Sequence, residues 1–248
     1  MKILNHRKEK GFTLAETLVA LVVGMVLLLA IYSVVNMAQK STTGIEGKVV
    51  AQQDARVALE IMALEIRMAS YSIYADDNIW VDPVTCNHPQ NPTYRGIRNA
   101  TANSITIEMD IDDDDDNDGD VDDPPCIGGG NEIIAYEYLP AELRITRKTI
   151  SCPGLTTAGA QPFLGPSATD PDSGGVKVIN GSLNVPLFRY YDGQGDEIDP
   201  GADLTVIPNI RRIAITIAAE TKDADPATRQ KRTLIYGTSV IPKNHGIR

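Results

Sequence analysis

The chain has 248 residues, a length that allows one membrane segment and one globular domain with a sizeable core. Its formal net charge of −10 is local, because residues 110–123 alone carry ten aspartates and no cation. The remainder is close to neutral and its soluble part has no concentrated basic face, which argues against a nucleic-acid-binding protein.

The N-terminal part has the pattern of a membrane segment. Residues 17–39 are uncharged, and a helix of that length, at about 1.5 Å per residue, crosses a bilayer core of roughly 30 Å. Cations between Lys2 and Lys10 precede it, so the positive-inside rule places the first residues in the cytoplasm and the chain after Lys40 on the exported side. A cleaved secretory signal is disfavoured, because the apolar run is too long and no clear small-x-small site follows it.

One carboxylate, Glu16, stands at the mouth of this apolar run, where an unpaired charge is costly. The stretch Lys10–Glu16 reads K-G-F-T-L-A-E. It resembles the cleavage and methylation signature of type IV prepilins and type II secretion pseudopilins. The resemblance implies that residues 1–11 are a cytoplasmic leader, that a dedicated peptidase cuts between Gly11 and Phe12, and that Phe12 is then N-methylated.

The resemblance also implies an assembly role for Glu16. Cleavage creates a positive amine on Phe12, and Glu16 of a neighbouring subunit can pair with it. Each charge alone is expensive in an apolar bundle, whereas the pair offsets much of that cost and sets the axial register between subunits. The implied partners are other minor and major pilins, the prepilin peptidase and methyltransferase, the assembly platform, and the inner membrane before assembly.

Residues 12–39 therefore form the predicted membrane and assembly helix, and residues 40–70 its amphipathic continuation. Ser41–Gly44 and Gly47 are expected to loosen or break the helix at the membrane exit. Beyond them, a stripe of apolar residues recurs at helical spacing and is expected to pack on a sheet: Val57, Ile61, Leu64 and Met68. Four more apolar residues widen that face: Ala55, Leu59, Met62 and Ile66. The pattern resembles the corresponding helix of PilW-type minor pilins.

Downstream the apolar period changes to two, which predicts strands. The predicted strands are Ser104–Met109, Glu132–Tyr138, Leu143–Ile150, Leu187–Tyr191, Arg211–Ala218 and Thr233–Val240. The second and third flank Leu139-Pro140-Ala141 as a hairpin, Thr156–Gly175 is expected to be a long surface loop, and Asp192–Asp199 a hairpin turn. A long helix followed by an antiparallel sheet gives an α+β, pilin-like fold, with residues 71–248 as the exported domain.

Three cysteines, Cys86, Cys126 and Cys152, all follow the membrane segment, which fits an oxidising compartment. If the hairpin pairs around residue 140, continuing its register brings Cys126 near Cys152. A bond there would constrain the unfolded chain by roughly 3 kcal/mol. Pairing of Cys86 with Cys126 remains the alternative.

The acidic run contains D-x-D-x-D-G, the opening of a calcium loop. Alternate aspartates supply oxygens, Gly119 supplies the sharp turn, and a later aspartate closes the sphere, so a structural Ca²⁺ is predicted. The proposed ligands are Asp114, Asp116, Asp118, Asp120, Asp122 and Asp123. The alternative interpretation is a solvated acidic loop whose charges repel one another.

Both ends of the chain resemble PilW-type minor pilins, the C-terminal part through F-R-Y-Y-D-G-Q-G-D-E and the strand I-R-R-I-A-I-T-I. The resemblance implies an inner-membrane subunit with an exported C-terminal domain that joins a priming or tip complex and then lies on the cell surface. The alternatives are a J-type minor pseudopilin of type II secretion and a membrane-anchored calcium-dependent adhesin. The sequence shows no Ser/His/Asp order, H-E-x-x-H motif, Cys/His pair or phosphate loop, so an enzyme is not expected.

Overall fold

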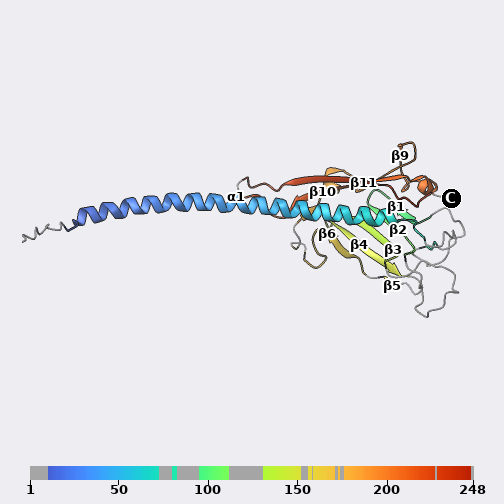
Figure 1. Cartoon of the computed structure of the whole chain (residues 1–248), viewed down its shortest axis with the longest axis horizontal. Helices are drawn as coiled ribbons and strands as arrows, with labels where there is room; N and C mark the ends of the chain where they lie inside the picture. The colour runs from blue at the N-terminus through green and yellow to red at the C-terminus, as the bar shows by residue number, and fades with distance from the viewer. Residues whose placement is uncertain are drawn as a thin grey trace, which may run out of the picture.

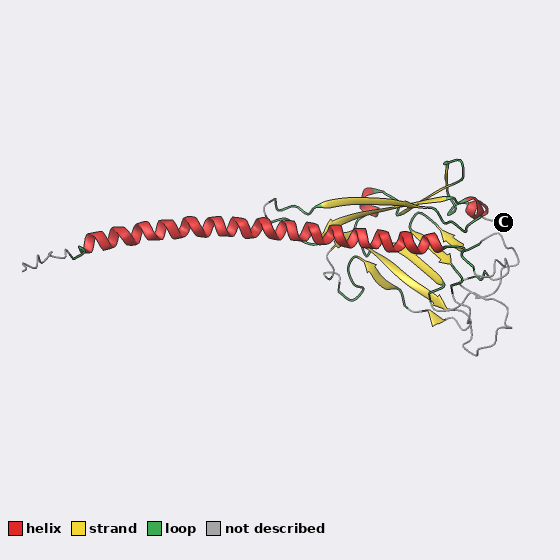
Figure 2. Ribbon diagram, viewed as in Figure 1, coloured by secondary structure: helices red, strands yellow, loops and turns green. Residues whose placement is uncertain are grey.

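A computed structural model describes residues 11–72, 80–82, 95–111, 131–151, 156–157, 159–170, 173, 176–226 and 228–246. Its elements, in chain order, are α1 (Leu14–Met68), β1 (Ile97–Ala100), β2 (Ser104–Glu108), β3 (Ile133–Leu139), β4 (Arg144–Ser151), β5 (Thr156–Thr157), β6 (Gln161–Leu164), β7 (Val176–Val178), the 3-10 helix η1 (Gly181–Leu183), β8 (Phe188–Tyr191), β9 (Glu197–Ile198), the 3-10 helix η2 (Leu204–Asn209), β10 (Arg212–Thr221) and β11 (Thr233–Val240). The N-terminal half of α1 projects from a head made of the strands and the C-terminal half of the helix (Figure 1, Figure 2).

Helix α1 runs without a break for 55 residues, so the predicted loosening at Ser41–Gly44 and Gly47 is wrong. Thr42 and Thr43 donate their hydroxyls to helix carbonyls four residues back, at 3.0 and 3.1 Å, and so satisfy those hydroxyls inside the helix. A glycine in a helix interior costs only about 1 kcal/mol relative to alanine. This cost is too small to interrupt the helix, because the turns before and after the glycines are helical.

The buried face of α1 differs from the predicted stripe. Val57, Ile61 and Leu64 are 53%, 39% and 63% exposed, whereas the residues expected only to widen the face form its centre. The buried residues of the helix are Ala51, Ala55, Ala58, Leu59, Met62 and Ile66. Three of these are alanines, whose small side chains let the helix approach the strands closely. Two apolar stripes lie on different sides of this helix, and periodicity alone does not distinguish them.

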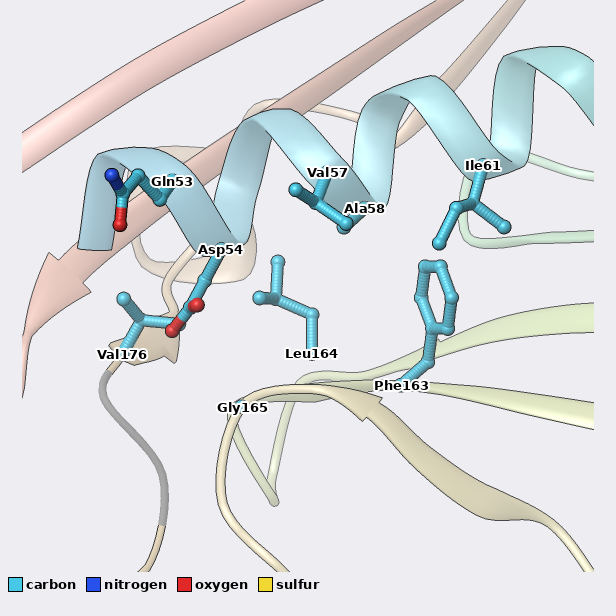
Figure 3. A pocket seen from close by; sticks show the side chains of 9 residues that line it. All are labelled: Gln53, Asp54, Val57, Ala58, Ile61, Phe163, Leu164, Gly165 and Val176. Atoms are coloured by element: carbon cyan, nitrogen blue, oxygen red, sulfur yellow. The ribbon is translucent and has the colours of Figure 1, made fainter. Parts of the chain in front are cut away.

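Val57 and Ile61 of the misassigned stripe line an open groove beside the helix. Figure 3 shows them facing Phe163 and Leu164 of β6 across a space of about 720 Å³. Phe163 also packs edge-on against Tyr136 of β3, with ring centroids 5.1 Å apart. The side of α1 turned toward β6 is therefore only half covered.

The head contains two antiparallel sheets, where the sequence predicted one. The first has the order β1-β2-β3-β4-β5, with β6 also paired to β4, and the second has the order β11-β10-β8-β9, with β7 also paired to β10. Helix α1 contacts β10 and β11 of the second sheet and β6 of the first, and Figure 1 shows it running between the two sheets. The predicted α+β architecture, a long apolar N-terminal helix packed on antiparallel strands, is confirmed.

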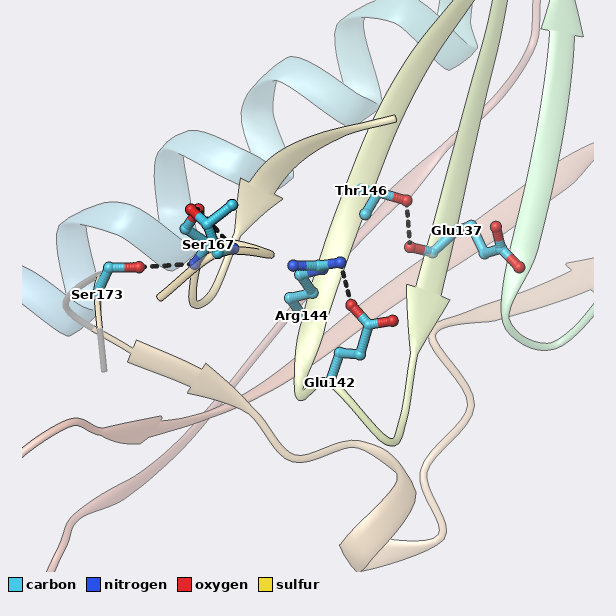
Figure 4. Close-up of polar contacts among 7 residues, drawn as sticks. Glu137, Glu142, Arg144, Thr146, Ser167 and Ser173 are labelled. Atoms are coloured by element: carbon cyan, nitrogen blue, oxygen red, sulfur yellow. Dashed lines mark hydrogen bonds and ion pairs between the residues drawn. The ribbon is translucent and has the colours of Figure 1, made fainter. Parts of the chain in front are cut away.

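The predicted hairpin is confirmed, with Ile133 opposite Ile150 and Leu139 opposite Arg144. Polar contacts reinforce its end: Arg144 forms an ion pair with Glu142, and Thr146 donates its hydroxyl to the Glu137 carbonyl at 3.3 Å (Figure 4).

The expected surface loop Thr156–Gly175 is partly wrong, because it contributes β5 and β6 to the first sheet. Strand β6 has four residues, one of them Pro162, so it lacks the alternation that marks a longer strand. Proline is tolerated there because the strand lies at an edge. Beyond β6, Ser167 donates its amide to Ser173 Oγ at 2.7 Å (Figure 4).

The turn predicted at Asp192–Asp199 is confirmed between β8 and β9, which pair through Tyr190 with Ile198 and Tyr191 with Glu197. Asp192 holds this turn, because its Oδ1 accepts the amides of the next residues in the loop at 2.9 Å. The aspartate therefore has a local structural role.

A charged contact joins α1 to the first sheet. Arg147 of β4 donates from Nη2 and Nε to the two carboxylate oxygens of Glu65, at 3.0 and 3.2 Å. Tyr136 of β3 donates its hydroxyl to the same carboxylate at 2.5 Å. Burial, together with this carboxylate, raises the pKa of Tyr136 well above its usual value. The bidentate geometry fixes the rotation of the helix as well as its distance from the strands.

The C-terminal end of the chain closes over the end of α1. Ser70 adopts a φ of 63°, donates its amide to Glu108 O at 2.9 Å and its hydroxyl to Arg95 O at 2.6 Å. The buried His245 lies against the same Arg95 carbonyl through Nδ1 at 2.7 Å. A Cβ at Gly96 would come within 2.2 Å of the Ser70 amide nitrogen, so this close approach requires glycine.

The reassigned helix face makes a direct prediction. Met62→Ala should lower the free energy of unfolding by about 2–5 kcal/mol, because it leaves a cavity in a fully buried site. Leu64→Ala, a matched truncation on the exposed side, should change it by less than about 0.5 kcal/mol. Urea unfolding of the detergent-solubilised chain, followed through its single tryptophan, the buried Trp80, measures both. A larger loss for Leu64→Ala would place the opposite face of the helix in the core.

Candidate processing and assembly site

The Gly11–Phe12 peptide bond lies in an open segment before the helix. Residues 11–13 have no regular secondary structure, and Phe12 is 89% exposed. A Cβ added at Gly11 would meet no atom of the described residues within 4 Å. No described residue therefore covers the bond that is predicted to be cut, which leaves it open to a peptidase.

Thr13 and Glu16 form a capping box that starts α1. The Thr13 amide and hydroxyl both donate to Glu16 Oε2 at 2.9 Å, and the Glu16 amide donates to Thr13 Oγ1 at 3.3 Å. Together these bonds satisfy two of the amides that a helix start leaves without an intrahelical partner. The spacing T-x-x-E at residues 13–16 is a known sequence signature of this arrangement, so the contact was detectable before the structure.

The capping box changes how the cost of Glu16 is understood. In a single chain the carboxylate already accepts two hydrogen bonds from Thr13, so it is not without partners when the helix enters the membrane. Both of these bonds end on Oε2 among the described residues, which leaves Oε1 for a donor from another chain. Glu16 can therefore be stabilised locally before assembly and still offer its charge to a neighbour.

The segment after Glu16 is apolar on every side. Among the described residues, α1 is the one helix long and apolar enough to cross a membrane, with a mean hydropathy of 2.9 in its most apolar window, none of which is buried in the head. Large side chains such as Leu18, Leu28 and Tyr32 are 59%, 67% and 69% exposed. Exposed apolar surface of this extent requires lipid or other helices around it.

The predicted calcium ligands Asp114, Asp116, Asp118, Asp120, Asp122 and Asp123 lie outside the described residues, as do Cys126 and Cys152 of the predicted disulfide. The described residues hold no group of three or more potential metal ligands. Hydrogen bonds join the described residues on either side of this segment: Met109 donates its amide to Glu132 O at 2.9 Å, and Ile111 donates its amide to Glu132 Oε1 at 3.0 Å. The described residues on either side of the segment 112–130 therefore lie next to each other, where β2 ends and β3 begins.

Comparison with known proteins bears on the N-terminal site. Residues 6–32 match the family model of the prokaryotic N-terminal methylation motif. A search of curated proteins found no match. Among solved structures the chain is similar to a type IV-like pilin, TTHA1219 from Thermus thermophilus, with 9% identity, a TM-score of 0.43, and coverage of 78% of this chain and 97% of that chain.

The motif match confirms the predicted prepilin-type N-terminus: residues 6–32 carry a prokaryotic N-terminal methylation motif. The match ends within the apolar segment, and it includes Gly11, Phe12 and Glu16. The position of the cut and the role of Glu16 stay predictions.

Gly11→Leu should block processing and leave residues 1–11 attached, because the branched side chain adds bulk next to the bond that the peptidase must enclose. Intact-mass measurement after co-expression with a prepilin peptidase distinguishes the processed and unprocessed chains. Gly24→Leu is the matched control, since a side chain there also meets no atom of the described residues within 4 Å but lies away from the bond. A Gly11→Leu chain cut to the wild-type mass would show that Gly11 does not define the site.

Proposed function

We propose that this protein is a minor type IV pilin of the PilW type, which assembles through its N-terminal helix into a complex that primes fibre growth and lies near the fibre tip. One observation carries the proposal: a prepilin motif leads directly into a long apolar segment of a helix that continues unbroken into the core of a β-rich head. The proposed role is structural rather than catalytic.

In the proposed sequence of events the chain first spans the inner membrane, with residues 1–11 in the cytoplasm and the head on the exported side. Hydrolysis of the Gly11–Phe12 bond releases the leader and leaves a free amine on Phe12, which is then methylated. The open geometry around this bond supports the first step. The cationic leader and the neutral apolar segment support the orientation.

Assembly then pairs Glu16 of one subunit with the Phe12 amine of another. The capping box supports this order of events, because it satisfies the carboxylate through Thr13 until the neighbour arrives. The pair forms between apolar helices, where a charge that lacks its partner is strongly destabilising. The proposed partners are other minor and major pilins, the peptidase and methyltransferase, and the assembly platform.

Glu16→Gln tests the pairing more sharply than truncation. Glutamine at the third helical position preserves the capping box but removes the charge. The variant should be cleaved normally, yet its abundance in sheared fibres should fall about tenfold or more, as for loss of a desolvated ion pair. Glu46→Gln, an exposed carboxylate on the same helix, is the control and should assemble normally. Wild-type incorporation of Glu16→Gln would refute the pairing.

Deletion of the whole protein separates the fibre role from a secretion role. Deletion of a minor pilin should abolish or shorten surface fibres and leave secretion of exported enzymes intact. A J-type pseudopilin would give the reverse. Counting fibres and assaying secretion in one deletion strain decides between the two.

A structural Ca²⁺ in the acidic run is part of the proposal. Its support is the D-x-D-x-D-G pattern together with the hydrogen bond from the Ile111 amide to Glu132, which joins the described residues on either side of the segment. Ten neighbouring carboxylates between two paired strands repel one another unless a cation balances them.

Chelation should therefore lower the thermal unfolding midpoint by about 5–10 °C, the shift expected for a site filled at about 100 times its dissociation constant. The double variant Asp114→Asn with Asp116→Asn should have the lower midpoint with or without chelator. Asp196→Asn, in the β8–β9 turn, should retain the wild-type response. A wild-type midpoint that is the same with and without chelator would contradict a structural calcium site.

A further inference from the structure

We propose that the β10–β11 turn, of which residues 222–226 and 228–232 are described, binds the phosphates of anionic lipids at the exported face of the membrane while the subunit awaits assembly. The inference rests on the membrane-embedded stage of the proposed function. It assigns a membrane contact to the head in addition to the spanning helix.

The hairpin carries its turn to the membrane end of the head. Strands β10 and β11 pair from Ile213 with Val240 to Glu220 with Thr233, and Figure 1 shows their connection beside α1, pointing toward its projecting half. The turn meets the helix at Gly44, where an added Cβ would lie 3.0 Å from Asp225 Oδ1. Glycine at this position therefore allows the turn to rest directly on the helix.

This contact places the turn close to the lipid surface. The last large apolar side chain before Lys40, the first cation of the helix, is Met37, and Gly44 follows Met37 by seven residues. At 1.5 Å per residue the turn stands on the order of 10 Å beyond the end of the apolar segment. The polar headgroup layer on each side of the hydrocarbon core is roughly 5–7 Å thick. Long cationic side chains from the turn therefore reach the phosphate level.

Two acids at the turn, Asp225 within it and Glu220 at the end of β10, form ion pairs. Asp225 is buried, and its Oδ2 accepts from Arg232 Nη2 at 2.6 Å and Nε at 3.2 Å. Lys231 pairs with Glu220 of β10 at 3.5 Å. Each pair joins one acid to one cation and is therefore neutral. The net charge of the outer surface is set by the remaining residues.

The remaining exposed charges are mostly positive. Lys222 and Arg229 of the turn take part in none of the ion pairs among the described residues, and Lys40 and Lys48 are exposed on the adjacent part of the helix. The exposed acids in this region are Glu46 and Asp223. Four cations against two acids make a surface that attracts lipid phosphates, an attraction that acts within about 10 Å at ordinary ionic strength.

Arg229 occupies a position that favours another residue type. Its φ of 57° lies in the left-handed region, and its amide donates to Asp225 O at 2.7 Å to close the turn. Glycine or asparagine would adopt this conformation at lower cost. Backbone geometry therefore does not explain the arginine at position 229.

Photo-crosslinking of the full chain in nanodiscs tests the contact. Benzoylphenylalanine replaces Ala224, an exposed residue of the turn, in discs of phosphatidylcholine with or without phosphatidylglycerol. The same probe at Gln194, in the β8–β9 turn, is the matched control, and at Leu27, in the apolar segment, it reports membrane insertion. We expect lipid adducts at position 224 at least about threefold above position 194, with a fall to the control level when Lys222→Gln and Arg229→Gln are combined or phosphatidylglycerol is omitted.

Each contrary result has a distinct meaning. Lipid adducts at position 27 with none above control at position 224 would overturn the membrane contact of the turn and leave the spanning helix intact. Absence of adducts at position 27 as well would overturn both the contact and the membrane-embedded stage on which it rests. Adducts at position 224 that are equal with and without phosphatidylglycerol would overturn the recognition of anionic lipid.

Discussion

A single unbroken helix imposes the main constraint on this protein. Over its first half α1 exposes apolar side chains in all directions, and over its second half it buries one face of small and medium residues between two sheets. Because one continuous helix contains both the apolar segment and the part buried in the head, its rotation and its axial position determine the orientation of the head relative to the membrane. The bidentate contact of Arg147 with Glu65 sets that rotation, and the approach of Asp225 to Gly44 sets the height.

Three carboxylates along and beside this helix have polar partners: Glu65 and Asp225 are largely buried in the head, and Glu16 lies at the start of the apolar segment. Glu16 is held by the Thr13 amide and hydroxyl, Glu65 by Arg147 and Tyr136, and Asp225 by Arg232. In each case the partner also positions a functional part of the chain: the helix start, the helix rotation or the membrane-facing turn. A poorly solvated charge requires a hydrogen-bonded partner, and these charged hydrogen bonds constrain the geometry at three points along the helix.

The parts of this structure that depend on local pattern were predictable. The prepilin motif is a contiguous run of residues, and the hairpin of β3 and β4 follows from alternation around a turn. The buried face of α1 was not predictable, because Val57 and Leu64 repeat at helical spacing as regularly as Leu59 and Met62, and only the position of the sheets chooses between them. Strand β6 escaped prediction because four residues with a proline form a strand only when β4 offers its edge.

The central claim, that the chain is cut before Phe12 and built into a fibre, is tested most directly by peptide mass spectrometry of sheared surface fibres with sequencing of the mature N-terminus. The account predicts this chain in the fibre fraction, with methylated Phe12 as its first residue. A chain that is processed but confined to the cell envelope would favour a pseudopilin over a fibre subunit. An uncleaved chain that begins at Met1 would contradict the account.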